Sequence, residues 1–254
     1  MAKIIEFFGA SGVGKTTTYN EVKSRWSTNL KWIPGEHLYP KKKISSGNVV
    51  KYIIKYICMR NETVDTGKML KARDRFVQQH YDFVEKCIKG IYCRAVEHDE
   101  SFQYIVMRLN ILDKLFQKVQ VITEYESNRY ALIDEGMIQH MGYALRDDSI
   151  SHECIDLYTS YEMLFEKCPI PEGVIFINTD PAIIAHRVYH RKKKLFKYKN
   201  LTETEIRSHV KRWSEDRVKR LNYLRNNGVK ILDLDGRDNV RENTQLVFNF
   251  LQEL

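Results

Sequence analysis

Eight consecutive residues near the N-terminus have the types and the spacing needed to bind a phosphate group. They read Gly9-Ala10-Ser11-Gly12-Val13-Gly14-Lys15-Thr16 and match the pattern G-x-x-x-x-G-K-[ST] in full. Glycines allow the backbone to turn so that successive N–H groups point inward, and the N-terminus of a following helix adds partial positive charge. The segment, with Thr17 after it, therefore predicts a binding site for the phosphates of a nucleotide.

Lys15 and Thr16 each have a side chain with a chemical task in such a loop. The Lys15 ammonium should reach the β- and γ-phosphates, and the Thr16 hydroxyl should bind Mg²⁺. A chance match to the whole pattern is rare in a chain of 254 residues, because Gly makes up only about 7% of residues in proteins. We therefore expect ATP and Mg²⁺ as the cofactors.

Asp134 and Glu135 form an acidic pair that could complete the magnesium site. They directly follow an apolar run, Tyr130-Ala131-Leu132-Ile133, that is typical of a buried strand. Ligands bind outside the carboxyl ends of parallel strands, so Asp134 is placed to hold the water shell of Mg²⁺. Glu135 is a candidate for orienting an attacking water or accepting a substrate proton, and a solvated turn residue is the alternative.

The apolar segments place these motifs on alternating strands and helices. Strands are expected at residues 4–8, 30–33, 130–133, 173–177 and 229–232. Helical periodicity is found at residues 19–26, 154–165, 206–224 and 240–251, with another helix beginning near Pro181. Apolar strands that alternate with helices indicate a parallel sheet covered on both faces. We therefore predict a three-layer α/β fold of the P-loop NTPase type, with a central parallel sheet of about five strands.

A long helical region lies between the second and third expected strands. Apolar residues step by three and four from Val77 to Ala95, and again from Phe102 to Val119, as in helices that pack one face on a core. We expect residues of about 37–128 to form a helical insert that binds the acceptor. The whole chain, residues 1–254, is predicted to be a single domain.

The composition is that of an ordinary globular protein with an excess of basic residues. A net charge of +8 favours an acidic partner such as nucleic acid, an anionic membrane surface or a polyphosphate. The five cysteines form no C-x-x-C pair, which argues against a disulfide framework or a structural zinc site. No apolar run approaches the ~20 residues of a membrane helix, and no signal peptide is apparent, so we expect a cytoplasmic protein without a membrane span.

The element order and three motifs resemble the thymidylate kinase and deoxynucleoside kinase group of P-loop kinases. The motifs are the glycine-rich loop after the first strand, Asp134-Glu135-Gly136 after a later strand, and a basic segment after Asn178-Thr179-Asp180-Pro181. The resemblance covers most of the chain, and only the glycine-rich loop is highly specific. It implies transfer of the γ-phosphoryl group of MgATP to a small-molecule acceptor, with a nucleotide or nucleoside as the first expectation.

The resemblance also implies an arginine-rich lid at about residues 185–203. Such a lid brings arginines onto the transferring phosphoryl group, where they balance its negative charge. Arg187 and Arg191 are four residues apart and are expected to share one face of the helix beginning near Pro181. We therefore expect both arginines to act in catalysis.

The acceptor site of this group supplies three further candidates. An arginine four residues after an aromatic contacts the acceptor's phosphate in such enzymes, and Tyr104 and Arg108 match that spacing. A carboxylate after the second strand lies near the acceptor hydroxyl, and Glu36 occupies the comparable place. A general base there must reach the hydroxyl within hydrogen-bond distance.

The chain departs from the pattern of these kinases after the third expected strand. The thymidylate kinase group usually has Asp-Arg-aromatic, and the deoxynucleoside kinases have Glu-Arg-Ser, where this chain has Asp134-Glu135-Gly136. The helical insert is also long for an acceptor-binding region. The acceptor therefore stays open between a nucleotide, a nucleoside, a sugar or other metabolite, and a larger anionic molecule.

Two other classes of P-loop protein compete with the kinase interpretation. A P-loop ATPase acting on nucleic acid would suit the charge of +8, but the chain has no Leu-Ser-Gly-Gly-Gln signature. A pure binding module would not need Lys15, Thr16 and Asp134 together. We therefore expect an enzyme, a phosphotransferase, with nucleic acid as a less favoured partner and a homodimer left open.

One pair of histidines has the spacing of metal ligands. His186 and His190 are four residues apart, so a helix would bring them to one face. No glutamate joins them in an H-E-x-x-H motif, and they lie in a basic stretch that repels cations. The sequence therefore gives little support to a metal site at this pair.

Overall fold

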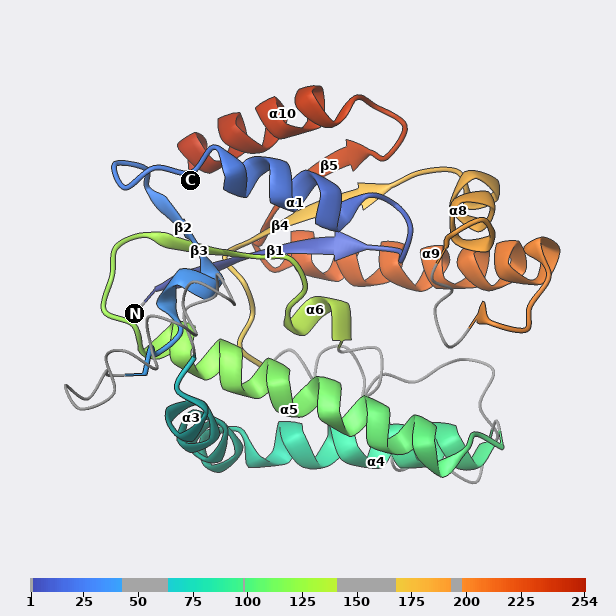
Figure 1. Cartoon of the computed structure of the whole chain (residues 1–254), viewed down its shortest axis with the longest axis horizontal. Coiled ribbons are helices and arrows are strands. Elements are labelled where there is room, and N and C mark those ends of the chain that lie inside the picture. Colours follow the sequence, from blue (N-terminus) through green and yellow to red (C-terminus); the bar gives the residue numbers. More distant parts are fainter. Residues whose placement is uncertain (1, 43–63, 98, 141–167, 193–197) are drawn as a thin grey trace, which may run out of the picture.

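A five-stranded parallel sheet forms the centre of the computed structural model, which describes residues 2–42, 64–97, 99–140, 168–192 and 198–254 (Figure 1). The strand order is β2-β3-β1-β4-β5, and every neighbouring pair is parallel. The bounds are β1 Lys3–Gly9, β2 Trp32–Pro34, β3 Tyr130–Ile133, β4 Gly173–Asn178 and β5 Lys230–Asp235. The prediction of a central parallel sheet of about five strands is confirmed.

Strand β1 lies in the middle of the sheet, and its side chains face both layers of helices. Ile5 and Phe7 belong to one apolar cluster, whereas Ile4 and Phe8 belong to the other. This division follows from the two-residue period of a strand, which points successive side chains to opposite faces. Phe7 and Phe8 are both 0% exposed, so this apolar run reads as a strand buried on both faces.

Helices cover both faces of the sheet, as expected for a three-layer fold. In Figure 1, α1 and α10 lie over one face, and α9 and the helices of the insert lie on the other. The helices are α1 Lys15–Ser24, α3 Thr66–Gln79, α4 Tyr81–Glu97, α5 Phe102–Glu124, α6 Met137–His140, α8 Pro181–Tyr189, α9 Glu203–Asn226 and α10 Val240–Glu253, with a 3₁₀ turn η1 at Gly35–Leu38. The short helix α6 lies between the sheet and α5.

The described part of the predicted insert is helical, as the periodicity indicated. Helices α3, α4 and α5 pack together through aromatic rings, with Phe76 and Phe116 stacked at a centroid distance of 4.6 Å. Phe83 meets Phe116 edge to face at 6.3 Å. Aromatic pairs of this kind add to the stabilisation from apolar burial. The helix expected at residues 154–165 lies outside the described residues.

The edge strand β5 differs from the expected fully apolar run. It continues to Asp235 and includes Asp233, whose side chain is exposed. Because β5 is the last strand of the sheet, it has a neighbouring strand on one side only, and charged side chains there remain solvated.

Among the described residues, no helix combines the length and the apolar character that crossing a membrane requires.

Candidate functional site

The glycine-rich loop connects β1 to α1, where the sequence placed it. Gly12 has φ of +91° and Gly14 has φ of +111°, and Gly14 caps the N-terminus of α1. Only glycine adopts such left-handed conformations without strain. The turn lets α1 begin at Lys15 with its free N–H groups next to the loop, the arrangement that binds phosphate.

Neighbouring elements pack tightly on this loop and fix its shape. A Cβ atom at Gly12 would lie 2.6 Å from Cγ2 of Val188 in α8, which is too close for any residue larger than glycine. A Cβ at Gly236, just after β5, would lie 2.5 Å from the carbonyl oxygen of Val13. The loop is therefore held between α8 and the turn that follows β5.

Lys15 folds back over the loop instead of extending into solvent. Its Nζ donates hydrogen bonds to the carbonyl oxygens of Gly9 (2.9 Å) and Ala10 (3.2 Å), and it forms an ion pair with Glu135 at 3.3 Å. Lys15 is buried, and this burial lowers its pKa, although Glu135 partly opposes the shift. The ammonium group thus lies at the loop and can exchange these partners for phosphate oxygens.

Thr16 and Asp134 meet as expected for a magnesium site. The Thr16 hydroxyl donates a hydrogen bond of 2.9 Å to Oδ2 of Asp134. The other oxygen, Oδ1, is buried and has no hydrogen-bond partner among the described residues. Burial raises the pKa of Asp134, and the hydrogen bond from Thr16 opposes that rise. A hydroxyl and a carboxylate with a free oxygen fit the ligand preference of Mg²⁺ for hard oxygen donors.

Glu135 lies between the loop lysine and a buried histidine. Besides its ion pair with Lys15, its Oε2 lies 3.7 Å from Nε2 of His140 in α6. Burial lowers the pKa of His140 to about 4. The imidazole is therefore neutral at pH 7, and this contact is a polar one between a carboxylate and a neutral ring.

Glu6 is a buried carboxylate that the sequence analysis did not single out. Its side chain on β1 accepts hydrogen bonds from the backbone N–H groups of Ile138 (3.0 Å) and Gln139 (2.7 Å). Gln139 in turn accepts a 3.2 Å bond from the N–H of Gly9. Burial raises the pKa of Glu6 to about 7. Glu6 thus ties the segment after Asp134 to the phosphate loop, and its charge inside an apolar strand was the available signal.

Arg217 is a second residue that the sequence analysis missed. It lies in the middle of α9, is 4% exposed, and stacks its guanidinium over the rings of Trp213 (4.6 Å) and Phe8 (5.8 Å). Burial lowers its pKa to about 9. Its charge helps to lower the pKa of Lys15, so the two groups lie close together. The negative charge of Glu135 opposes part of the lowering of the Arg217 pKa. Its Nη1 has no hydrogen-bond partner in the described part of the chain.

Arg108 approaches the same region from the helical insert. It is buried on α5, and its guanidinium lies 4.7 Å from the centroid of the Tyr104 ring, one helical turn away. Arg108 and Arg217 both act on the pKa of Tyr198, which burial raises. Arg108 also acts on His140. The expected acceptor arginine and the missed arginine therefore both lie near Tyr198.

Glu36 follows β2 in the 3₁₀ turn η1 and points toward α1. It accepts short hydrogen bonds from the Tyr19 hydroxyl and from Nζ of Lys23. Burial alone would raise its pKa, but the hydrogen bonds from Lys23 and Tyr19 outweigh burial and hold the pKa below its ordinary value. Glu36 is therefore ionised at neutral pH, as a general base must be.

The two predicted lid arginines are not arranged as expected. Helix α8 ends at Tyr189, and Arg191 lies beyond its C-cap His190, so Arg187 and Arg191 do not share a helix face. The Arg191 N–H bonds to the carbonyl of Val188 in a tighter final turn, which ends the regular helix. Arg187 donates a 3.0 Å bond from Nη1 to the carbonyl of Gly236 and thus lies beside the turn after β5.

Comparisons with known proteins agree with this architecture. The sequence matches no protein-family model and no curated protein. Among solved structures, deoxyadenosine kinase from M. mycoides with the products dCMP and a flexible dCDP matches 99% of this chain and 100% of its own, at 13% identity and a TM-score of 0.50. The same enzyme with bound dATP matches 98% of this chain and 99% of its own, at 12% identity and a TM-score of 0.50. The chain therefore has the P-loop α/β fold seen in deoxyadenosine kinase.

Proposed function

We propose that this protein is a P-loop kinase that transfers the γ-phosphoryl group of MgATP to a small-molecule acceptor. The observation that carries the proposal is the geometry of the glycine-rich loop, where Lys15 bonds to the loop carbonyls and Thr16 bonds to Asp134 from the end of β3. Two buried arginines, Arg108 from the insert and Arg217 from α9, add positive charge. Phosphoryl transfer proceeds mainly by positioning and by stabilising negative charge, for which such an arrangement is suited.

The nucleotide would bind with its phosphates over the glycine-rich loop. Residues 9–17 supply the backbone N–H groups of the loop and of the first turn of α1, and Lys15 would release its carbonyl partners to bind the β- and γ-phosphates. Thr16 and Asp134 would hold Mg²⁺, directly or through water. When bound, Mg²⁺ would neutralise charge on the phosphates.

The arginines would bind the negative charges that Lys15 and Mg²⁺ do not neutralise. Arg217 lies close enough to Lys15 and Glu135 to interact with their charges, and we propose that it contacts the transferring group. Arg108 lies farther along the insert, near His140 and Tyr198, and would contact an anionic acceptor. Arg187, beside the turn after β5, and Arg191 would join from the lid region.

The acceptor is proposed to be a nucleotide or nucleoside, and a sugar or other metabolite is the alternative. The solved structures with the same fold are described with deoxynucleotides bound. Arg108 beside Tyr104 combines a cation with an aromatic ring, a pair able to contact both a phosphate and a base. Glu36 is the proposed general base for the acceptor hydroxyl.

The decisive experiment is ATP turnover by the purified protein against nucleosides, nucleotides, sugars, single-stranded DNA and RNA, with phosphorus NMR of the products. The proposal expects one small molecule to stimulate turnover and to appear phosphorylated. Stimulation by nucleic acid alone, with free phosphate as the sole product, would replace the kinase by a P-loop ATPase. A Lys15→Ala variant that stays folded but transfers nothing would tie the activity to the loop.

A further inference from the structure

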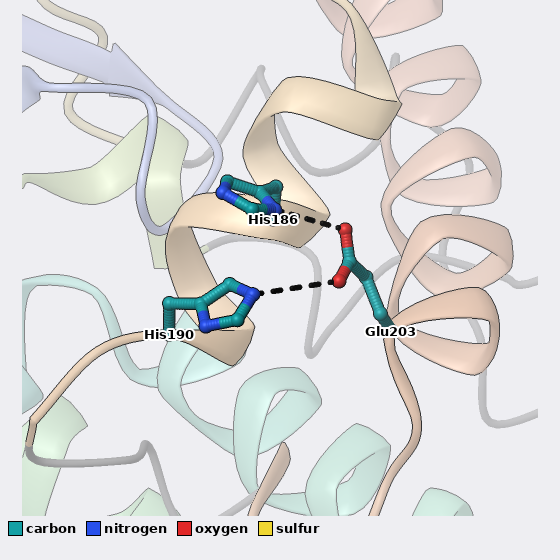
Figure 2. Close-up of side chains that lie close together, drawn as sticks. All are labelled: His186, His190 and Glu203. Carbon is teal, nitrogen blue, oxygen red and sulfur yellow. Dashed lines mark hydrogen bonds and ion pairs between the residues drawn. The ribbon is translucent and has the colours of Figure 1, made fainter.

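Two histidines and a glutamate come together where α8 meets α9 (Figure 2). His186 lies in the last turn of α8, His190 caps that helix, and Glu203 is the first residue of α9. Nδ1 of His186 lies 3.3 Å from Oε1 of Glu203, and Nε2 of His190 lies 3.8 Å from Oε2. One ligand atom from each residue can be chosen so that all three lie within 4.8 Å of one another.

These distances suit a small divalent cation. Zn²⁺ binds histidine nitrogen and carboxylate oxygen at roughly 2.0–2.2 Å, so two of its tetrahedral ligands lie about 3.4 Å apart. The separations of 3.3 Å and 3.8 Å run to different oxygens of Glu203, so the carboxylate must turn to offer one oxygen to an ion that both histidines bind. Two imidazoles and one carboxylate are also a ligand set that zinc uses, with a fourth position left for water.

The fold brings the three residues together without the ion. His186 and His190 are one helical turn apart, and their ring centroids are 4.4 Å apart. Glu203 begins α9 directly after Thr202, which forms a capping box with Glu205. Helices α8 and α9 pack on each other in a shared apolar cluster. The backbone positions of the three ligands are therefore set by two helix ends that pack together, while the exposed side chains must still close on the ion from ligand-atom separations within 4.8 Å.

We propose that His186, His190 and Glu203 form a binding site for a divalent cation of the zinc class. The histidine pair alone gave little support to such a site because no glutamate lies within one helical turn. Tertiary structure supplies the missing acid from a residue 17 positions after His186. The site is exposed, so the ion can enter from solvent, and the carboxylate offsets part of the repulsion from nearby Arg187 and Arg191.

A bound ion would tie α8 to α9 at the base of the region expected to form the lid. Helix α8 carries Arg187, and α9 carries Arg217, which lies near the phosphate loop. A cation bridging the two helices would thus stabilise the relative position of two arginines proposed for phosphoryl transfer. The existence of the site does not depend on that transfer, and its test needs no substrate.

The test is calorimetric titration of the chelator-treated full-length protein with Zn²⁺, and absorption spectroscopy with Co²⁺, which reports tetrahedral coordination. The wild type should bind the ion at one site and melt at a higher temperature when the ion is present. His186→Asn, His190→Asn and Glu203→Gln should each weaken that binding by at least about tenfold, the change that loss of even an outer partner causes. Glu215→Gln, an exposed carboxylate on the same helix, is the matched control.

Two results would overturn the proposal. One is a wild type that binds neither Zn²⁺ nor Co²⁺. The other is binding that persists unchanged in His190→Asn and Glu203→Gln, which would place the ion on other histidines or cysteines of the chain. Because all three ligands are exposed or half-buried, circular dichroism should show that each variant keeps the wild-type fold.

Discussion

Thr16 and Asp134 are joined by a 2.9 Å hydrogen bond although 118 positions separate them in the sequence. The bond forms because β1 and β3 are adjacent parallel strands whose carboxyl ends meet at one edge of the sheet. Oδ1 of Asp134 stays buried and without a partner among the described residues. The carboxylate and the hydroxyl together offer hard oxygen donors, the ligand type that Mg²⁺ prefers.

Replacing Thr16 tests this site with little risk to the fold, because the residue is exposed. Thr16→Val removes the hydroxyl and keeps the shape, so Mg²⁺-dependent turnover should fall by roughly 10²–10³-fold, as when one charge-stabilising group is lost. Thr16→Ser keeps the hydroxyl and should retain most activity. The measurement is turnover against Mg²⁺ concentration, and equal activity of the Val and Ser variants would contradict the assignment.

Arg217 should matter for catalysis and not for stability. Its guanidinium is buried with a lowered pKa, so replacement by Met removes a desolvated charge and should leave the free energy of unfolding unchanged or about 1 kcal/mol higher. Phosphoryl transfer should fall by about 10³-fold or more, as for other arginines that stabilise the transferring group. Urea unfolding and turnover are compared with Arg212→Met, an exposed arginine on the same helix. A large loss of stability with little loss of turnover would make Arg217 a structural residue.

Glu36 and Glu135 can be separated as candidates for the general base. Lys23 and Tyr19 outweigh the burial of Glu36 and hold its pKa below the ordinary value. If Glu36 is the base, the enzyme should therefore lose activity only in acid. Glu36→Gln should lower kcat by roughly 10²–10⁴-fold and abolish the acid limb of the pH profile. Glu135→Gln should keep that limb. The reverse pattern in the two profiles would assign the base to Glu135.

Glu6 predicts a stability that falls as pH rises. Its pKa is about 7 in the folded protein because of burial, against 4.5 for an ordinary glutamate. The contribution of Glu6 to the free energy of unfolding is therefore fully present below pH 4.5. It is lost as pH rises through about 7, and the loss is on the order of 3 kcal/mol. Glu6→Gln cannot ionise and should flatten the pH dependence of unfolding across this range, with exposed Glu126→Gln as the control. An unchanged slope in Glu6→Gln would show that other groups cause it.

The sequence alone predicted the glycine-rich loop, the succession of the five strands along the chain, and the acid at the end of the third strand. Each of these depends on local patterns, since a glycine-rich turn between an apolar strand and a helix constrains its own backbone. The length of β5 was underestimated because an edge strand tolerates charged residues such as Asp233. The spatial order of the strands within the sheet could not be predicted, because crossover connections and not sequence proximity decide which parallel strands are neighbours.

Tertiary structure alone decided which distant side chains share a site. The sequence analysis did not single out Arg217 or Glu6, and only packing shows that both are buried near the phosphate loop. Glu203 joins His186 and His190 because α8 and α9 abut, which no spacing in the chain records. Arg191 does not share a helix face with Arg187 because α8 ends at Tyr189. Sequence spacing determines contacts within one element, whereas contacts between elements depend on how their surfaces pack.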